Sequence, residues 1–189
     1  MIVGIDNAGK STTLEQLKLK YTGKGMDLAK IPPTIGLNSM FLLLRKFYIL
    51  VGRFQVDGVV AICWDVGGQL NLRQLWSNYF EEVDGIIFVM DSSDRARFDE
   101  SFAALKTVLD NSSLKGKPLL FLANKSDITD ASSLEEISPI FNFNTISGRP
   151  FLSLACSAKS DIGLEEGIRW IVSEAVKFNS AKMISSNSN

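Results

Sequence analysis

Residues 4–11 read GIDNAGKS, which matches the phosphate-binding pattern G-x-x-x-x-G-K-[ST] at every fixed position. The two glycines let the backbone turn tightly, so that successive N–H groups can point at one anion. The ammonium group of Lys10 suits the outer phosphates of a nucleotide, and the hydroxyl of Ser11 suits Mg²⁺. A glycine-rich turn that binds nothing is the alternative, but an amphipathic run follows the motif directly, as a phosphate loop requires. The sequence therefore predicts binding of a nucleoside phosphate.

A second group of residues suited to phosphate chemistry follows an apolar run, where residues 64–69 read WDVGGQ. An acidic residue at the end of a strand near a phosphate loop suits a hard cation, which makes Asp65 a candidate for holding Mg²⁺ through water. Gly68 would let the backbone approach a terminal phosphate, and Gln69 would orient an attacking water. The motif thus predicts a hydrolytic site with Gln69 as its catalytic residue.

A third group, NKSD at residues 124–127, could select the base. The carboxylate of Asp127 can accept hydrogen bonds from the ring N1–H and the exocyclic amino group of guanine, two adjacent donors that adenine lacks. Asn124 would brace the pocket, and the stem of Lys125 would lie against the base. Backbone N–H groups of the CSAK sequence at 156–159 could meet the guanine O6, although a plain strand-to-helix turn explains that sequence almost as well.

The sequence PTIG at residues 33–36 lies between the first two motifs. The hydroxyl of Thr34 could ligate Mg²⁺ while neighbouring residues bond the terminal phosphate, so that this loop becomes ordered only when that phosphate is present. A simple turn is the alternative. We favour the switch interpretation because the segment follows a phosphate loop and precedes Asp65.

Short apolar runs alternate with helical patterns along the chain, which is typical of a parallel sheet wound by crossover helices. The predicted strands cover residues 2–5, 59–65, 85–91, 118–124 and 150–155, and a helix is predicted from residue 11 to about 20. Apolar stripes at helical spacing predict two more helices, with core positions at 98, 102, 105 and 109 and at 164, 168, 171 and 175. The predicted fold is an α/β phosphate-loop NTPase, with a mostly parallel sheet and helices on both faces.

Ligands of such sheets collect at the carboxyl ends of the strands. The polar residues that end or follow the predicted strands are Asp65, Asp91, Asn124 and Ser157. We therefore expect these four residues to lie at one edge of the sheet, close to the phosphate loop.

The composition limits the function classes that need consideration. The 189 residues suffice for one domain with a sizeable core, and the formal net charge of −1 gives no basic field for nucleic acid. The chain has no histidine, which excludes His-based acid–base catalysis and most zinc chemistry. Cys63 and Cys156 lie in apolar runs and are interpreted as reduced core residues. No signal peptide is evident, and no apolar run reaches the roughly 18–20 residues that span a bilayer.

With these residues assembled, the chain resembles the Arf family of small GTPases from residue 2 to about residue 178. The motifs that carry the resemblance are GIDNAGKST (4–12), PTIGLN (33–38), WDVGGQ (64–69), LWSNYF (75–80) and NKSD (124–127). Within the family, the chain is most similar to the Arf-related protein branch, on the sequences LEQLK (14–18), KGMDLAKI (24–31), GLN (36–38) and EGIRWIV (166–172).

The resemblance implies a switch that binds GTP or GDP with Mg²⁺ and hydrolyses GTP slowly unless an activating protein stimulates it. It also implies an exchange factor and effectors that bind the switch regions, and a cytoplasmic protein that cycles to Golgi membranes in vesicle trafficking. By matching motif, the catalytic residue is Gln69 and the metal residues are Ser11, Thr34 and Asp65. The implied nucleotide-binding residues are Asp6, Asn7, Ala8, Gly9, Lys10, Ser11, Thr12, Thr34, Gly68, Asn124, Lys125, Asp127, Ser157 and Ala158.

Two features depart from the family pattern. Members normally carry an extension before the first strand, often an amphipathic helix that reports the nucleotide state to a membrane, whereas Met1 here lies directly before that strand. We therefore expect a truncated first strand, and peripheral membrane association where the native protein has a longer N-terminus. The second departure is an apolar insertion at residues 39–50, which separates the GLN sequence from a hairpin predicted at 51–58.

The insertion has two interpretations. It could form an extra strand or a membrane-touching loop, although an exposed apolar run of this kind favours aggregation. Alternatively it is a retained intron, because residues 39–41 can be encoded with a GT donor and residues 50–51 with an AG acceptor. Excision between these sites would restore the family spacing without a frame shift, and uninterrupted reads of the run in mature mRNA would contradict this interpretation.

We predict one GTPase domain over residues 1–178 and a polar, disordered tail over residues 179–189. Two other functions remain open on the sequence alone. A non-hydrolysing GTP-binding scaffold is disfavoured by the presence of Gln69 and Thr34. A phosphate-loop ATPase or kinase is disfavoured by the NKSD and WDVGGQ motifs.

Overall fold

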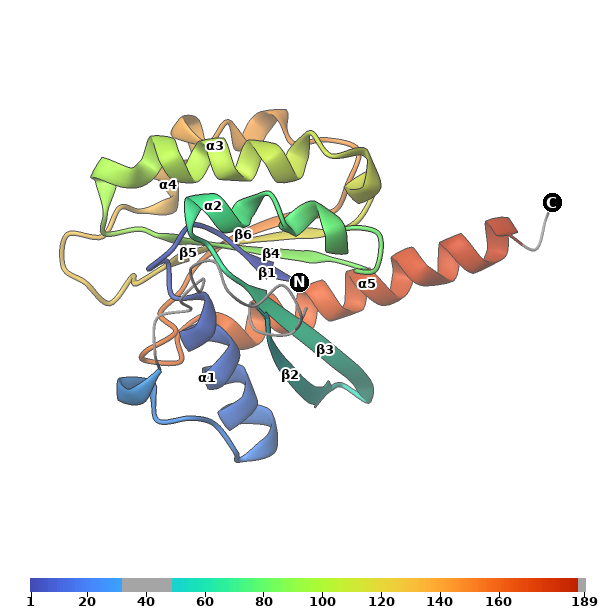
Figure 1. The fold of residues 1–189 in the computed structure, drawn as a ribbon, viewed down its shortest axis with the longest axis horizontal. Helices are drawn as coiled ribbons and strands as arrows, with labels where there is room; N and C mark the ends of the chain where they lie inside the picture. The colour runs from blue at the N-terminus through green and yellow to red at the C-terminus, as the bar shows by residue number, and fades with distance from the viewer. Residues whose placement is uncertain (32–48, 187–189) are drawn as a thin grey trace.

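The computed structural model describes residues 1–31 and 49–186, and Figure 1 shows a central sheet with helices on both faces. The strands are β1 (Ile2–Val3), β2 (Ile49–Val56), β3 (Val59–Val66), β4 (Ile86–Asp91), β5 (Leu119–Asn124) and β6 (Phe151–Ala155). Their order in the sheet is β2-β3-β1-β4-β5-β6. Only the β2–β3 pair is antiparallel among these strands, so the predicted α/β fold with a mostly parallel sheet is confirmed.

The central strands β4 and β5 are apolar except at their last residues, Asp91 and Asn124, as expected of strands that helices cover on both faces. Every residue of β5 is buried, and β4 is buried except at Asp91, where the strand reaches the edge of the sheet. The short strand β1 lies between β3 and β4, with Ile2 paired to Asp65 on one side and to Ile87 on the other. This pairing places the residue after β1, Gly4, at the same edge of the sheet as Asp65 and Asp91.

The helices are α1 (Lys10–Thr22), α2 (Leu70–Arg73), α3 (Phe98–Leu109), α4 (Leu134–Ile140) and α5 (Leu164–Ser186). Short 3₁₀ turns occur at Leu28–Lys30, Trp76–Tyr79, Arg95–Arg97, Ser112–Leu114 and Phe143–Thr145. Helices α1 and α5 lie below the sheet in Figure 1, and α2, α3 and α4 lie above it. None of the helices within residues 1–31 and 49–186 combines the length and the apolar character that crossing a bilayer requires.

The predicted helical stripes pack on the sheet as expected. Phe98 and Leu105 of α3 are buried, and so are Leu164, Ile168 and Ile171 of α5. A cluster of phenylalanines fills the space between the sheet and α3 and α4, with ring centroids of Phe121 and Phe143 4.7 Å apart.

Both cysteines of the chain are free and buried, in agreement with the sequence-based interpretation.

Two parts of the chain differ from the prediction or lie outside it. Residues 39–48 of the insertion lie outside the described residues, but its last two residues begin β2, where Leu50 pairs with Asp65. The tail was expected to be disordered from residue 179, which is wrong up to Ser186, because α5 continues to that residue. The polar composition of this segment misled the prediction, since its residues include no proline and no glycine that would end a helix. The far end of α5 extends away from the sheet in Figure 1.

Candidate nucleotide-binding site

The phosphate loop turns from β1 into α1 through three residues with positive φ. Gly4 has φ 142°, Asn7 has φ 62° and Gly9, the N-cap of α1, has φ 95°. A Cβ atom on Gly4 would lie 2.0 Å from the carbonyl oxygen of Val89, so only glycine fits against β4 there. A Cβ atom on Gly9 would lie 2.2 Å from Nδ2 of Asn124. The two fixed glycines of the motif therefore serve close packing as well as the tight turn.

Lys10 begins α1 and its side chain folds back over this loop. It is only 6% exposed, and its Nζ donates a hydrogen bond of 2.8 Å to the carbonyl oxygen of Ile5. Burial lowers the pKa of the Lys10 ammonium to about 8, and the nearby carboxylates of Asp65 and Asp6 partly oppose this shift. An ammonium group that is buried beside backbone N–H groups and a helix N-terminus suits a phosphate anion.

A cavity of about 430 Å³ opens above the loop. Its lining combines phosphate-loop residues with residues of the second and third motifs, namely Asp6, Asn7, Gly9, Lys10, Ser11, Thr12, Gly68, Gln69 and Lys125. Leu28 and Ile31, which follow α1, complete the lining. Its volume is typical of a small-molecule site. A second cavity of about 370 Å³ between β3 and α5 is more apolar, and none of the predicted site residues line it.

The candidate metal residues meet where β3 ends beside α1. The Ser11 hydroxyl donates a 2.5 Å hydrogen bond to Oδ2 of Asp65, and the buried Oδ1 of Asp65 has no hydrogen-bond partner among the described residues. Burial raises the pKa of the Asp65 carboxyl, against the opposing effects of Lys10 and Ser11. A hydroxyl and a carboxylate oxygen are hard ligands of the kind that Mg²⁺ takes together with phosphate oxygens and water, and a cation would satisfy the unpaired oxygen.

The remaining candidate ligand, Thr34, lies outside the described residues. Within residues 1–31 and 49–186, no group of three or more His, Cys, Asp or Glu side chains could hold a metal ion. Ser11 and Asp65 supply two oxygen ligands, which fits a metal whose other ligands come from phosphate oxygens and water.

Asn124 ties the third motif to the phosphate loop. The residue is 2% exposed, its Nδ2 donates to the carbonyl oxygen of Ala8 at 2.8 Å, and its Oδ1 accepts from the backbone N–H of Ala158 at 2.9 Å. Three loops that follow β1, β5 and β6 are thereby fixed by one side chain. On the sequence alone, the N–H of Ala158 could meet the guanine O6. In this structure that N–H donates to Oδ1 of Asn124.

Lys125 and Asp127 lie on the outer side of the same loop. The Lys125 ammonium pairs with Oδ2 of Asp91 at 2.5 Å, and Lys125 has φ 67°. Asp127 is exposed, and a hydrogen bond with Ser157 is the main cause that lowers the pKa of its carboxyl. The ionised Asp127 can accept hydrogen bonds from a base. The structure thus brings Asp91, Asn124 and Ser157 together, as expected from their places at the strand ends.

The loop of the second motif packs directly over the phosphate loop. The carbonyl oxygen of Gly67 accepts a 2.9 Å hydrogen bond from Nε1 of the buried Trp76. The carbonyl oxygen of Gly68 accepts from the backbone N–H of Asp6 at 3.1 Å and from Nε of Arg73 at 2.8 Å. Gln69 follows as the N-cap of α2 and lines the cavity.

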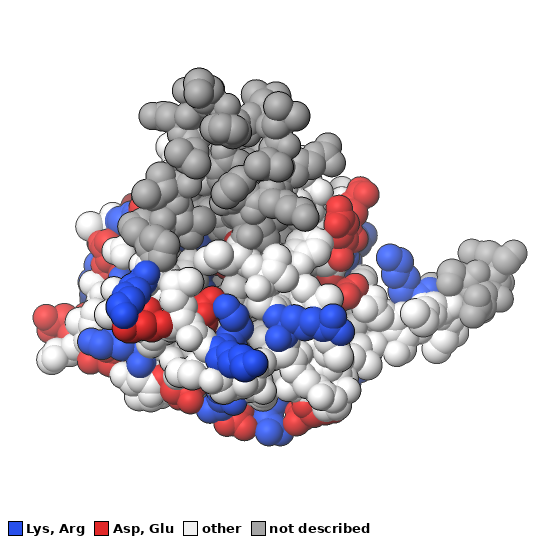
Figure 2. Space-filling view, turned by 60° about the horizontal axis from the view of Figure 1, so that its bottom comes forward, with Lys and Arg blue, Asp and Glu red and all other residues white. Residues whose placement is uncertain are grey.

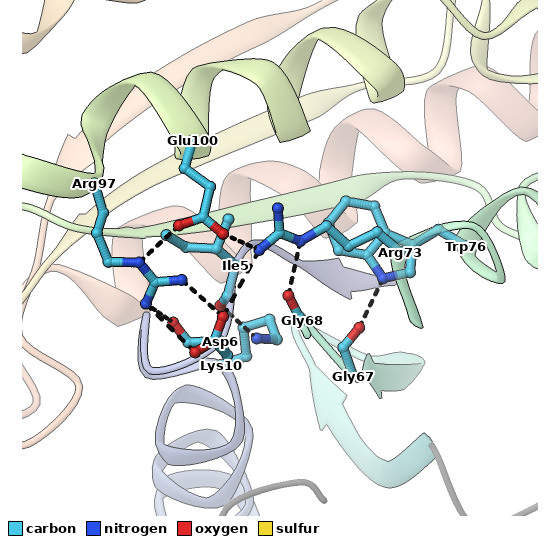
Figure 3. Close-up of polar contacts among 9 residues, drawn as sticks. All are labelled: Ile5, Asp6, Lys10, Gly67, Gly68, Arg73, Trp76, Arg97 and Glu100. Carbon is cyan, nitrogen blue, oxygen red and sulfur yellow. Dashed lines mark hydrogen bonds and ion pairs between the residues drawn. The ribbon is translucent and has the colours of Figure 1, made fainter. Parts of the chain in front are cut away.

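Sequence reasoning missed an ion-pair network that surrounds this contact (Figure 3). Arg73 pairs with Glu100 of α3, Glu100 also pairs with Arg97 at 2.8 Å, and Arg97 pairs with Oδ1 of Asp6 at 2.7 Å. Arg97 and Glu100 are spaced i, i+3 at the start of a helix, and this spacing was a usable signal. The partners Asp6 and Arg73 are distant in sequence, and nothing local connects them to α3.

A phosphate loop at the carboxyl edge of a mostly parallel sheet, joined by Asn124 to the loops that follow β5 and β6, defines a phosphate-loop nucleotide-binding protein. A family model described as the ADP-ribosylation factor family matches residues 1–175. The chain belongs to this family, and it is accordingly a GTP-binding small GTPase.

Individual relatives agree with this assignment. ADP-ribosylation factor-related protein 1 of Rattus norvegicus is 40% identical over 181 residues, which covers 94% of this chain and 84% of the relative. ADP-ribosylation factor-like protein 3 of Saccharomyces cerevisiae is 40% identical over 174 residues, covering 91% and 82%. The solved Arl6 BBS3 small GTPase of Trypanosoma brucei, with the nucleotide analogue GppNp bound in that structure, has a TM-score of 0.71 and 26% identity, covering 93% of this chain and 96% of that one.

The role of Asn124 as a brace can be tested by removing its side chain. We expect Asn124→Ala to lower the free energy of unfolding by about 2–4 kcal/mol, because the carbonyl of Ala8 and the N–H of Ala158 lose their buried partner. Urea unfolding measures this change. The control is Asn144→Ala at an exposed position, and an equal effect of the two substitutions would contradict the bracing role.

The ion-pair network predicts an unusual titration of Glu100. The neighbouring Arg97 guanidinium, and then that of Arg73, lower the pKa of this carboxyl to about 2 from its ordinary 4.5. Because the folded-state pKa is the lower one, Glu100 stabilises the fold above about pH 4.5 and this contribution is lost as the pH falls towards 2. Solvent screening at this partly exposed site weakens the effect.

We therefore expect carboxyl NMR titration to give a pKa for Glu100 well below 4.5, and Arg97→Ala to raise it more than Arg73→Ala does. Arg95→Ala is the control, because Arg95 pairs with Glu136 and not with Glu100. A wild-type Glu100 that titrates near 4.5 would show that the network does not form in solution.

Proposed function

We propose that the cavity binds GTP or GDP together with Mg²⁺ and that the chain changes partners according to which nucleotide it holds. The observation that carries this proposal is that three separate segments converge at the cavity. Lys10, Gly68 and Lys125 line it from the phosphate loop, the second motif and the third motif. Behind this lining, Asp65 accepts a hydrogen bond from Ser11, and Asn124 donates one to the carbonyl of Ala8. Lys10 would hold the outer phosphates, while Ser11 and Asp65 would support the metal, which would neutralise phosphate charge. Backbone N–H groups of residues 6–12 would bond the remaining phosphate oxygens.

Gln69 is proposed as the residue that orients the attacking water. It lines the cavity directly after Gly68, where a terminal phosphate would lie between it and Lys10. Hydrolysis in such sites is slow, on the order of 10⁻⁴ to 10⁻² per second, unless a second protein completes the site. An activating protein, an exchange factor and effectors are the partners that this cycle requires, and the switch segments are the surfaces that they would contact.

The cellular role that we propose is recruitment of effectors to Golgi membranes in vesicle trafficking, by a cytoplasmic protein that binds these membranes peripherally. The Arf family assignment and the switch chemistry support this role. On the face of the molecule drawn in Figure 2, the described acidic and basic side chains are interspersed, which favours a protein partner over nucleic acid. A tagged full-length protein should colocalise with a Golgi marker, and more strongly as Gln69→Leu; a uniform distribution of that variant would contradict this role.

The base preference provides a direct test of the site. The carboxylate of Asp127 can accept a hydrogen bond from the exocyclic amino group of guanine. Xanthine has a carbonyl in place of that amino group, and the side-chain NH₂ of an asparagine at position 127 can donate to it. We expect Asp127→Asn to weaken GDP binding by about 100-fold and to strengthen binding of xanthosine diphosphate, as measured by calorimetry. Asp130→Asn, an exposed substitution in the same loop, should leave both affinities unchanged. Unaltered base preference in Asp127→Asn would refute this site assignment.

A further inference from the structure

Gly68 lies against the phosphate loop at the place where the outer phosphates would be bound. A Cβ atom on Gly68 would lie 2.4 Å from Nζ of Lys10 and 2.3 Å from the carbonyl oxygen of Gly4. Only a glycine fits so close to the buried ammonium group. The backbone of Gly68 is therefore the part of the second motif that is nearest to a terminal phosphate held by Lys10.

The orientation of the backbone at Gly68 is fixed from both sides (Figure 3). A peptide unit is planar, so the hydrogen bond from Trp76 to the carbonyl of Gly67 also sets the direction of the Gly68 N–H. In the next peptide unit, Nε of Arg73 and the N–H of Asp6 hold the carbonyl of Gly68 at 2.8 Å and 3.1 Å. A glycine has little conformational preference of its own, so these contacts decide its geometry.

Arg73 is itself held in place by α3. Its side chain is 11% exposed, its Nη2 pairs with Oε1 of Glu100, and the same Nη2 lies 3.7 Å from Oδ1 of Asp6. The other carboxylate oxygen of Glu100 accepts from Nε of Arg97, which leaves Glu100 little freedom to rotate. A planar guanidinium with two fixed anchors is a rigid support for the one carbonyl that it bonds.

We propose that Arg73, oriented by Glu100, is a positioning residue that sets Gly68 for contact with a terminal phosphate and thereby increases the preference of the protein for the triphosphate over the diphosphate. This rests on the proposed function, in which Gly68 contacts that phosphate. Because GDP lacks the terminal phosphate, the support that Arg73 gives to Gly68 acts on GTP binding alone. An ordinary structural ion pair would affect both nucleotides equally.

The experiment compares the affinities of the full-length protein for GDP and for GppNp, a triphosphate analogue, by calorimetry with Mg²⁺. We expect Arg73→Ala to weaken GppNp binding about tenfold and to change GDP binding less than twofold. Glu100→Ala should also weaken GppNp binding. The double variant should lose no more affinity for GppNp than Arg73→Ala alone, because Glu100 acts only through Arg73. The control is Arg95→Ala, which removes an arginine with an exposed ion pair near α3.

If Arg73→Ala lowers the affinities for GDP and GppNp equally, or lowers neither, the proposal is overturned. If Arg73→Ala fails to fold, Glu100→Gln keeps the test decisive, since it weakens the pairing and keeps the shape of the side chain. Gly68→Ala separates this proposal from the function on which it rests. Loss of GppNp preference in Gly68→Ala but not in Arg73→Ala would overturn the role of Arg73 alone. No change of preference in Gly68→Ala would overturn both.

Discussion

The buried ammonium group of Lys10 is the constraint on which the nucleotide site depends. A cation that is 6% exposed must be partnered, and the hydrogen bond to the carbonyl of Ile5 meets this need only in part. The nearby carboxylates of Asp65 and Asp6 add opposite charge, but Asp65 keeps one buried oxygen without a partner. A phosphate beside Lys10 and a hard cation beside Asp65 would satisfy both groups together. This is the physical reason for proposing that a nucleotide and a metal bind here together.

The rest of the fold positions the loops that surround Lys10. The parallel pairing of β1 with β3 and β4 brings the ends of these strands to one edge, and Asn124 then links the loops that follow β1, β5 and β6. Close packing at Gly4, Gly9 and Gly68 leaves no room for a Cβ atom at any of the three positions. The loops that follow β1, β5 and β6 are therefore tied to one another and to the sheet. The second motif contacts the phosphate loop through the hydrogen bond from Asp6 to Gly68.

Much of this arrangement is predictable from the sequence for a physical reason. The strands are short apolar runs, and the phosphate loop and the NKSD loop have characteristic residue types at fixed spacing. These signals are local, and the meeting of the strand ends at one edge follows from a general rule of parallel sheets. The use of the Ala158 N–H by Asn124 could not be predicted, because it depends on the relative positions of two loops. The same holds for the network of Asp6, Arg73, Arg97 and Glu100, whose side chains come from three separate segments.

Composition misled the prediction at the C-terminus, where polar residues continue α5 to Ser186. Polarity describes the surface that a segment presents and does not by itself decide between helix and disorder.

The central claim is that this site holds a guanosine phosphate, and the shift in melting temperature with different nucleotides tests it most directly. A ligand that binds only the folded state raises the melting temperature, by an amount that grows with the logarithm of the ratio of its concentration to its Kd. With Mg²⁺ present, GDP and GppNp should each raise the melting temperature of the full-length protein by several degrees, and ADP at the same concentration should leave it unchanged. Equal shifts with ADP and GDP, or no shift with either guanosine nucleotide, would contradict the account.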